Sequence, residues 1–337
     1  MNASKDIRYW LCSIIALGFM FFFKYVPPIG AITADGMNII GIFIGMIVAY
    51  CTVGTIWPSI LAIILLGLSD GYNIINVFMS AFGHTVVLFM FILLVIGKAL
   101  EDSGITQIFA NWLVSRKIAH NRPWVLSTLI ILAAFVCALF IGMIAPALIC
   151  WTIVTNICTR VGYQKGDAWP TYMIFTIMFL ATVASFVFPF QLGVVTNFGI
   201  LTQVSGGTIV NQFIPYLIFS SLLCSLIFAI CILAGKYIIK PDVSLLKNNE
   251  TIETKLSFDK NQKALLVWFI IFVIGLFLPS ILPSSPIQAV LSEMGNTGWS
   301  AFMIALGAFI KVDNRELINF NSLASQGVVW DIILMMA

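Results

Sequence analysis

Residues 123–159 read PWVLSTLIILAAFVCALFIGMIAPALICWTIVTNICT. This stretch is apolar for almost twice the ~20 residues that one membrane-spanning helix needs. It is interrupted around Ile141-Gly142-Met143-Ile144-Ala145-Pro146. Divided by a turn, it is somewhat short for two complete spans. The pattern therefore favours a re-entrant hairpin that enters and leaves on one side.

The next apolar segment, residues 169–201, is also too long for one span. Pro189 and Gly193 interrupt it, so we expect a broken helix. Irregular backbone at membrane depth persists only where protein or a water-filled cavity satisfies its polar groups. Two such segments in succession therefore indicate a re-entrant hairpin followed by a broken helix, and not ordinary helix kinks.

The composition agrees with a membrane protein. Hydrophobic residues make up 61% and charged residues 9% of the chain, whereas soluble domains carry roughly 25% charged residues. The sequence predicts an all-α polytopic fold. The first apolar run has no small-residue cleavage site, so we expect a retained helix and not a signal peptide. The other expected spans are residues 9–26, 36–53, 55–70, 77–98, 213–239, 264–283 and 295–311.

Several function classes are disfavoured. The net charge of +3 is spread over loops, which argues against a nucleic-acid partner. The seven cysteines show no CxxC spacing, and HExxH, GxSxG and P-loop motifs are absent. We therefore expect no enzyme and no cofactor. Of the two histidines, His84 and His120, we expect His84 to be structural, with a proton relay as the alternative.

The positive-inside rule orients the chain. With the N-terminus in the cytoplasm and 123–159 returning to its own side, only Lys24 of the 17 basic residues falls outside. Two complete spans would give the same charge pattern as a re-entrant hairpin. We expect a multi-pass protein of the cytoplasmic (inner) membrane.

Two segments between spans have distinct patterns. Residues 99–118 carry apolar side chains at helical spacing, which predicts an amphipathic helix on the cytoplasmic membrane face. Residues 241–263 form a polar cytoplasmic linker. The apolar positions of the amphipathic helix are Ile105, Ile108, Phe109, Trp112 and Leu113.

A weak internal repeat crosses this linker. Trp57 is followed by Phe78 after 21 residues, and Trp299 by Phe320 after the same interval. Opposite orientations of the two Trp-containing spans indicate an inverted repeat, common in secondary transporters, although interfacial tryptophans could coincide by chance. We delimit an N-terminal helix (1–35), a first repeat (36–240), the linker (241–263) and an incomplete second repeat (264–337).

The chain resembles the divalent anion/sodium symporters, which are the dicarboxylate, citrate and sulfate carriers of the ion transporter superfamily. The resemblance runs over most of the chain. It rests on Gly97-Lys98-Ala99-Leu100-Glu101-Asp102-Ser103-Gly104-Ile105, the hairpin at 123–159, Gly193-Val194-Val195-Thr196-Asn197-Phe198-Gly199, the polar linker, and Val328-Val329-Trp330-Asp331-Ile332-Ile333-Leu334.

The resemblance implies a scaffold and a transport domain, a homodimer, and transport by alternating access. The family's hairpin tip reads Ser-Asn-Thr and holds sodium through oxygen atoms. Here Gly142, Met143 and Ile144 stand at those positions. Their side chains offer no oxygen, so sodium coupling would have to use backbone carbonyls.

We predict substrate binding at Gly142, Ala145, Gly193, Thr196 and Asn197. A hairpin tip offers free N–H groups and a helix-dipole end to an anion. A polar pair such as Thr196-Asn197 inside an apolar segment tends to face a cavity. A sodium ion, if one couples transport, is expected near Gly142, Thr196 and Asn197. The alternatives are a plain tight turn at the tip and helix–helix hydrogen bonding by the polar pair.

The expected function is secondary active transport of a small anion, such as a di- or tricarboxylate, with or without a coupling cation. The chain ends at Trp330-Asp331-Ile332-Ile333-Leu334-Met335-Met336-Ala337, which resembles the opening of a helix. Two alternatives therefore remain open: an inactive, C-terminally truncated carrier fragment, and an arsenite or ion exporter of the same superfamily.

Overall fold

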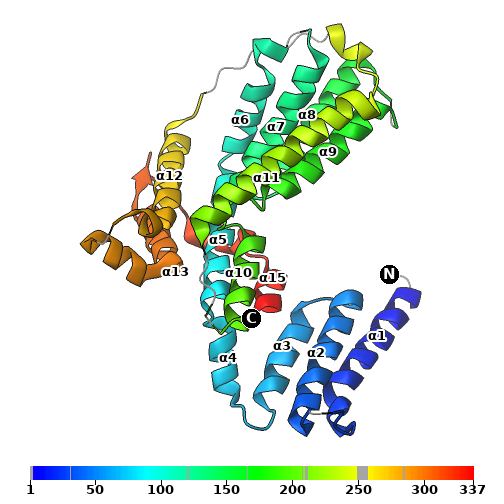
Figure 1. The fold of residues 1–337 in the computed structure, drawn as a ribbon, viewed down its shortest axis with the longest axis vertical. Coiled ribbons are helices and arrows are strands. Elements are labelled where there is room, and N and C mark those ends of the chain that lie inside the picture. The colour runs from blue at the N-terminus through cyan, green and yellow to red at the C-terminus, as the bar shows by residue number, and fades with distance from the viewer. Residues whose placement is uncertain are drawn as a thin grey trace. The chain divides into compact units, whose positions relative to one another are not determined.

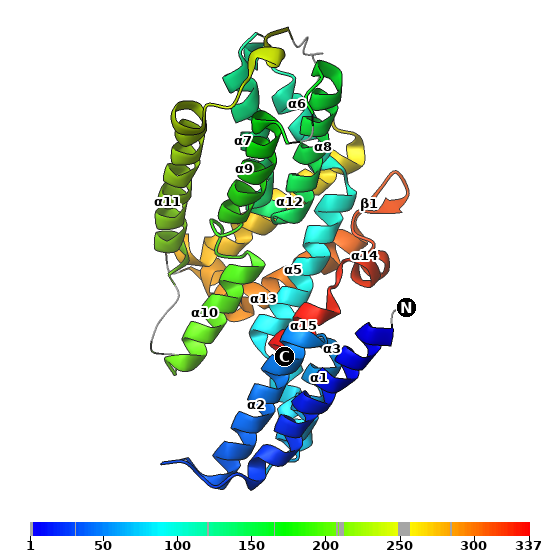
Figure 2. The same cartoon turned by 90° about the vertical axis from the view of Figure 1, so that its right-hand side faces the viewer.

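A computed structural model describes residues 3–30, 32–119, 121–164, 166–206, 208, 212–248, 257–283 and 285–337. His120, Lys165, Lys255 and linker residues 249–256 lie outside the described residues. The described chain is mostly helical (Figures 1 and 2). It forms two compact units, one of residues 1–91 with 328–337 and one of residues 92–327. The domains delimited by the repeat stay a prediction.

The first unit is built on a close pair of antiparallel helices, α1 (Ala3–Phe22) and α2 (Ala34–Thr52). Gly41 and Gly45 lie one turn apart on α2. A Cβ at Gly45 would lie 2.6 Å from the Ala16 carbonyl oxygen, and one at Gly41 would lie 2.8 Å from that of Phe19. Small residues at this spacing let two helix backbones approach within a membrane. The unit also contains η1 (Phe23–Tyr25), α3 (Ile56–Gly67), α4 (Ile74–Phe82), the first turns of α5 (Thr85–Asp102), and α15 (Trp330–Met336).

The second unit has its core in three helices, α7 (Pro123–Ile141), α8 (Ile144–Val161) and α9 (Ala168–Ala184). Trp169 is fully buried, and its indole N–H donates to Ser127 Oγ across 2.9 Å. The other helices are α6 (Ile105–Val114), η2 (Lys117–Ala119), α10 (Leu192–Val204), α11 (Phe213–Ala234), the π-helical turn η3 (Gly235–Ile239), η4 (Ser244–Asn248), α12 (Lys260–Ile281), α13 (Pro286–Phe309) and α14 (Phe320–Gly327).

One short antiparallel hairpin follows α13. Its strands are β1 (Lys311–Val312) and β2 (Arg315–Glu316). Asp313 and Asn314 both have positive φ, as the two central residues of a type I′ turn require.

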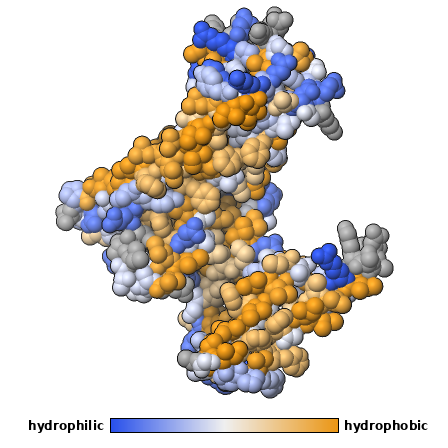
Figure 3. Space-filling model, turned by 45° about the vertical axis from the view of Figure 1, so that its right-hand side comes forward, coloured by the Kyte–Doolittle hydropathy of each residue, from blue (hydrophilic) through white to orange (hydrophobic). Residues whose placement is uncertain are grey.

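Six helical segments among the described residues are long and apolar enough to cross a membrane. They are α1 with η1, α2, α7, α8, α11 with η3, and α12. Large hydrophobic side chains are exposed along them, for example Phe43 on α2 and Leu222 on α11. Figure 3 shows hydrophobic residues over much of the visible surface. These observations establish a multi-pass membrane protein.

Three predicted spans are corrected. The segment 55–70 holds only the 12 residues of α3, about 18 Å of helix, too short to cross. The segment 77–98 lies in two helices, α4 and α5, bent by 45°, which together are still long and apolar enough to form one broken span. Gly83 ends α4, and His84 Nδ1 accepts from Val86 N at the start of α5, which is a structural role. The segment 295–311 begins at a kink of α13 at Gly295, and its helix ends at Phe309, before Lys311 enters β1.

The amphipathic helix and the linker also differ from expectation. The helix is shorter than predicted, and α6 packs against α7 and α8. Its buried face includes Ala110 and Val114, which belong to the core of this unit. The linker ends earlier, because Asp259 and Gln262 form a capping box that starts α12 at Lys260. Before that, Leu246 is buried in the same core.

The two Trp-containing segments share a succession of elements. The helix with Trp57 and the second part of α13 with Trp299 are each followed by a short helix with an asparagine cap. Asn73 accepts from Ile75 N before α4, and Asn319 accepts from Ser322 N before α14. Both short helices precede a break and a further helix. This likeness supports the repeat, which stays a prediction.

Candidate functional site

The first helix break lies between α7 and α8, at Gly142 and Met143. Gly142 has φ 95° and ψ 178°, a conformation that favours glycine. Its N–H still donates to the Ala138 carbonyl, 3.3 Å away. Ala145 lies half-buried in the first turn of α8. The break is therefore a tight corner, where the sequence placed it.

The two helices that flank the first break have nearly the same length. α7 has 19 residues and α8 has 18. Each is about 27 to 29 Å long, close to the thickness of the hydrocarbon core. The segment 123–159 is therefore long enough for two spans, contrary to the prediction, because the corner takes up only two residues. The re-entrant arrangement stays a prediction.

The second break, residues 185–191, separates α9 from α10 and contains Pro189. Gly193, predicted to lie in the interruption, is instead the second residue of α10. Gln191 precedes α10, and its carbonyl accepts from Val194 N and Val195 N. This break is longer than the first and leaves more backbone groups to be satisfied by other elements.

Side chains on one face of α11 satisfy carbonyl groups of this break. Tyr216 OH donates to Phe186 O across 2.6 Å. Ser220 Oγ lies 2.8 Å from Val187 O and 2.7 Å from Tyr216 O. Cys224 Sγ lies 3.5 Å from a carbonyl oxygen near the end of α9, just before the break. The spacing i, i+4, i+8 places the three side chains on one stripe of α11. This spacing in the apolar run 213–239 was a sequence signal that we missed.

The two breaks are joined by a hydrogen bond and by a contact between a hydroxyl and a sulfur atom. Gln191 Nε2 donates to Leu139 O across 2.7 Å. Leu139 lies in the last turn of α7, where carbonyl groups have no intrahelical partner. Thr182 Oγ1 on α9 lies 3.3 Å from the Met143 sulfur. The tip and the second break therefore meet in one place, the break junction, defined here by Leu139, Met143, Thr182 and Gln191.

The predicted site residues lie on both sides of the break junction. Gly142 and Ala145 are at the first break. Gly193 and Asn197 are exposed on α10, and Thr196 is half-buried. Thr196 Oγ1 donates to Leu192 O one turn earlier. The contacts that join the breaks come from Gln191 and Thr182, which we did not select. Gln191 could have been found, because it and Asn197 are the only amide side chains in 169–201.

The electrostatics of the break junction come from the backbone. Segments 123–159 and 168–204 contain no charged residue. The N-termini of α8 and α10 both begin next to the junction, at Ile144 and Leu192. Helix N-termini carry free N–H groups and partial positive charge, which suit a carboxylate. Thr182 and Gln191 supply oxygen atoms, as do backbone carbonyls of the breaks. Among the described residues there is no group of three His, Cys, Asp or Glu side chains able to hold a metal ion.

Comparison with known proteins shows the family of the chain. No curated protein matches the chain. A family model for a citrate transporter matches residues 48–337, which is most of the sequence and includes both breaks. This family transports substrates across membranes and is not a class of enzymes. The chain therefore belongs to the citrate transporter family.

Proposed function

We propose that this protein is a secondary active transporter of a citrate-like di- or tricarboxylate. It acts in the cytoplasmic (inner) membrane with its N-terminus in the cytoplasm, as a homodimer, by alternating access. The anion binds at the break junction. The observation that carries this proposal is the hydrogen bond from Gln191 Nε2 to Leu139 O, since it holds two helix breaks and two helix N-termini together.

The binding chemistry follows from the junction. A multivalent carboxylate normally pairs with Arg or Lys, yet these segments contain neither. The N–H groups at the start of α8 and α10 take that role. Asn197, exposed one turn along α10 from Gly193, donates its amide to a carboxylate oxygen. Thr196, the neighbour of Asn197 on α10, lies at the same binding surface. Discontinuous helices with their N-termini at the substrate are a recurring arrangement in secondary transporters.

A coupling cation is part of this proposal. A cation bound beside the anion lowers the cost of moving a multivalent charge through a low dielectric. The oxygen atoms near Gly142, Thr196 and Asn197 are the candidate ligands for sodium. The tip side chains supply none of them, so the cation would depend on backbone carbonyls there.

The test is uptake of radiolabelled citrate by the purified chain in liposomes. Three conditions are compared: an inward sodium gradient, an inward proton gradient, and neither. Uptake above that of protein-free liposomes, driven by one gradient, supports the proposal and identifies the coupling cation. No citrate uptake under any condition contradicts it.

Binding at α10 is tested separately. We expect Asn197→Ala to raise the KM for citrate about tenfold, the effect of losing one hydrogen bond to a charged group, with little change in thermal stability. Thr202→Ala, an exposed residue further along α10 whose hydroxyl donates to Phe198 O, is the control. Equal KM values for the two variants would remove Asn197 from the site.

A further inference from the structure

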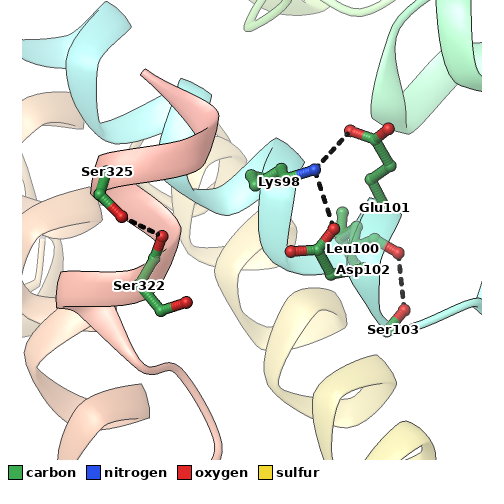
Figure 4. Close-up of polar contacts among 7 residues, drawn as sticks. All are labelled: Lys98, Leu100, Glu101, Asp102, Ser103, Ser322 and Ser325. Carbon is green, nitrogen blue, oxygen red and sulfur yellow. Dashed lines mark hydrogen bonds and ion pairs between the residues drawn. The ribbon is translucent and has the colours of Figure 1, made fainter.

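The end of α5 is joined to α6 by a compact corner, residues 98–105 (Figure 4). Lys98 Nζ lies 2.9 Å from Asp102 Oδ1 and 3.7 Å from Glu101 Oε2. Gly104 has φ 70°, which turns the chain into α6 at little steric cost. The charges of the corner are therefore paired within it.

The Ser103 hydroxyl stabilises the corner with two hydrogen bonds. Its hydroxyl donates to Leu100 O across 2.6 Å and accepts from Ile105 N across 3.3 Å. From here α6 runs onto α7 and α8, where Ala110 and Val114 join the core. A shift of the corner would thus be passed through α6 to the helices that carry the first break.

The helix α12 is hydrogen-bonded to the corner through one side chain. Gln262 Nε2 donates to Ser103 O across 2.9 Å. The oxygen of the same amide accepts from Asp259 N, 3.0 Å away, and Asp259 Oδ1 accepts from Gln262 N across 2.7 Å. The capping box therefore fixes the orientation of the amide that holds the corner.

The helix α14 touches the corner through a glycine. A Cβ at Gly327 would collide with Lys98 Cβ and lie 2.7 Å from Lys98 Cγ. The Ser325 hydroxyl is used within the same helix, because its Oγ donates to the backbone carbonyl of Ser322 across 2.9 Å (Figure 4). The contact between α14 and α5 at this point is thus one of close packing, and only glycine fits it.

We propose that Gln262 and Gly327 are positioning residues for transport. Through the corner at 98–105 and α6, they set the geometry of the first break at Gly142 and Met143. The proposal rests on the proposed function, since it concerns how the C-terminal helices α12 and α14 control the candidate binding site. Neither residue touches the substrate.

The decisive experiment measures the break directly. Hydrogen–deuterium exchange of residues 139–147 is followed in the purified full chain, alongside citrate uptake in liposomes. We expect Gly327→Ala to speed exchange and to slow uptake, each about tenfold, because overpacking shifts the population of the correctly packed state by that order. Gly97→Ala is the matched control, since a Cβ there meets nothing within 4 Å.

Second-site variants separate the contact from a general defect. Gly327→Ala with Lys98→Gly removes both colliding atoms and should restore exchange and uptake. Gly327→Ala with Lys98→Ala keeps Lys98 Cβ and should not. Equal behaviour of the two double variants, or Gly327→Ala matching Gly97→Ala in exchange, would overturn the proposal.

Gln262→Glu tests the second contact without disturbing the start of α12. Glutamate keeps the oxygen that caps Asp259 N and loses the N–H that holds Ser103 O. We expect faster exchange at 139–147 and unchanged exchange at 260–266. Unchanged exchange at 139–147 would exclude Gln262 from the role. If the native chain takes up no citrate while exchange follows these patterns, the proposed function fails and the positioning of the break stands.

Discussion

The two helix breaks of the second unit are built in opposite ways. The α7–α8 corner is two residues long and closes through its own backbone, because Gly142 adopts a conformation that other residues rarely do. The α9–α10 break is seven residues long, 185–191. Besides the backbone turns within it, side chains of α11 bond to its carbonyl groups, and its own Gln191 bonds to α7. An apolar chain can therefore be interrupted either by one glycine or by a set of tertiary hydrogen bonds, and only the first is visible locally.

The largest expected effect comes from removing the bond between the two breaks. Gln191→Leu deletes the donor to Leu139 O and leaves a helix-terminal carbonyl unsatisfied, at about 3 kcal/mol of unfolding free energy. We expect citrate uptake to be lost as well. Unfolding in mixed detergent–dodecyl sulfate micelles measures the stability. The exposed loop residue Gln164 gives the control variant Gln164→Leu. If both variants lose the same unfolding free energy, the bond between Gln191 and Leu139 does not stabilise the protein.

Gly142→Ala tests the local construction of the first break. An L side chain at φ 95° is strained by about 2 kcal/mol. We expect a lower midpoint in the same unfolding titration. Gly18→Ala on α1 is matched to it, since a Cβ there is unobstructed and the residue is helical. A stable Gly142→Ala would show that the corner closes in another way.

Ser220→Ala tests the tertiary construction of the second break. The variant removes the hydroxyl that lies 2.8 Å from Val187 O, and we expect about 1 kcal/mol of destabilisation. Ser225→Ala, exposed on the same helix, serves as the comparison. Adding Tyr216→Phe to Ser220→Ala should lower the unfolding free energy by less than Tyr216→Phe does alone, because the effects of neighbouring groups in one network are not additive. If the two losses of unfolding free energy simply add, the side chains on this stripe of α11 stabilise the break independently of one another.

The smallest effect is expected at Thr182. Thr182→Val keeps the shape and removes a hydroxyl that donates to Met178 O and lies against the Met143 sulfur. Sulfur is a weak acceptor, so we expect about 0.5 kcal/mol or less. Citrate uptake should fall less than with Gln191→Leu. A larger loss in uptake than in stability would move Thr182 into the binding site.

The sequence by itself determined the membrane class and the interruptions of the segments 123–159 and 169–201. Composition and apolar run length suffice for this, since lipid demands long uncharged helices. The break at Gly142 lay where the sequence indicated, because a glycine acts through its own backbone. The predicted site residues Thr196 and Asn197 were recognised as polar groups in an apolar segment, which is also a local property.

Only the tertiary structure decided which interruptions meet. The bond from Gln191 to Leu139 links positions 52 residues apart, and no periodicity encodes such a pair. The continuous span expected at 77–98 was divided, because His84 and Gly83 act as caps that hydropathy does not register. Of the apolar face predicted for α6, only Ile105 is buried, and the helix packs on the α7–α8 pair through a neighbouring face with Ala110 and Val114. Apolar burial is non-directional, so a sequence shows that a face must be covered, and packing alone decides what covers it.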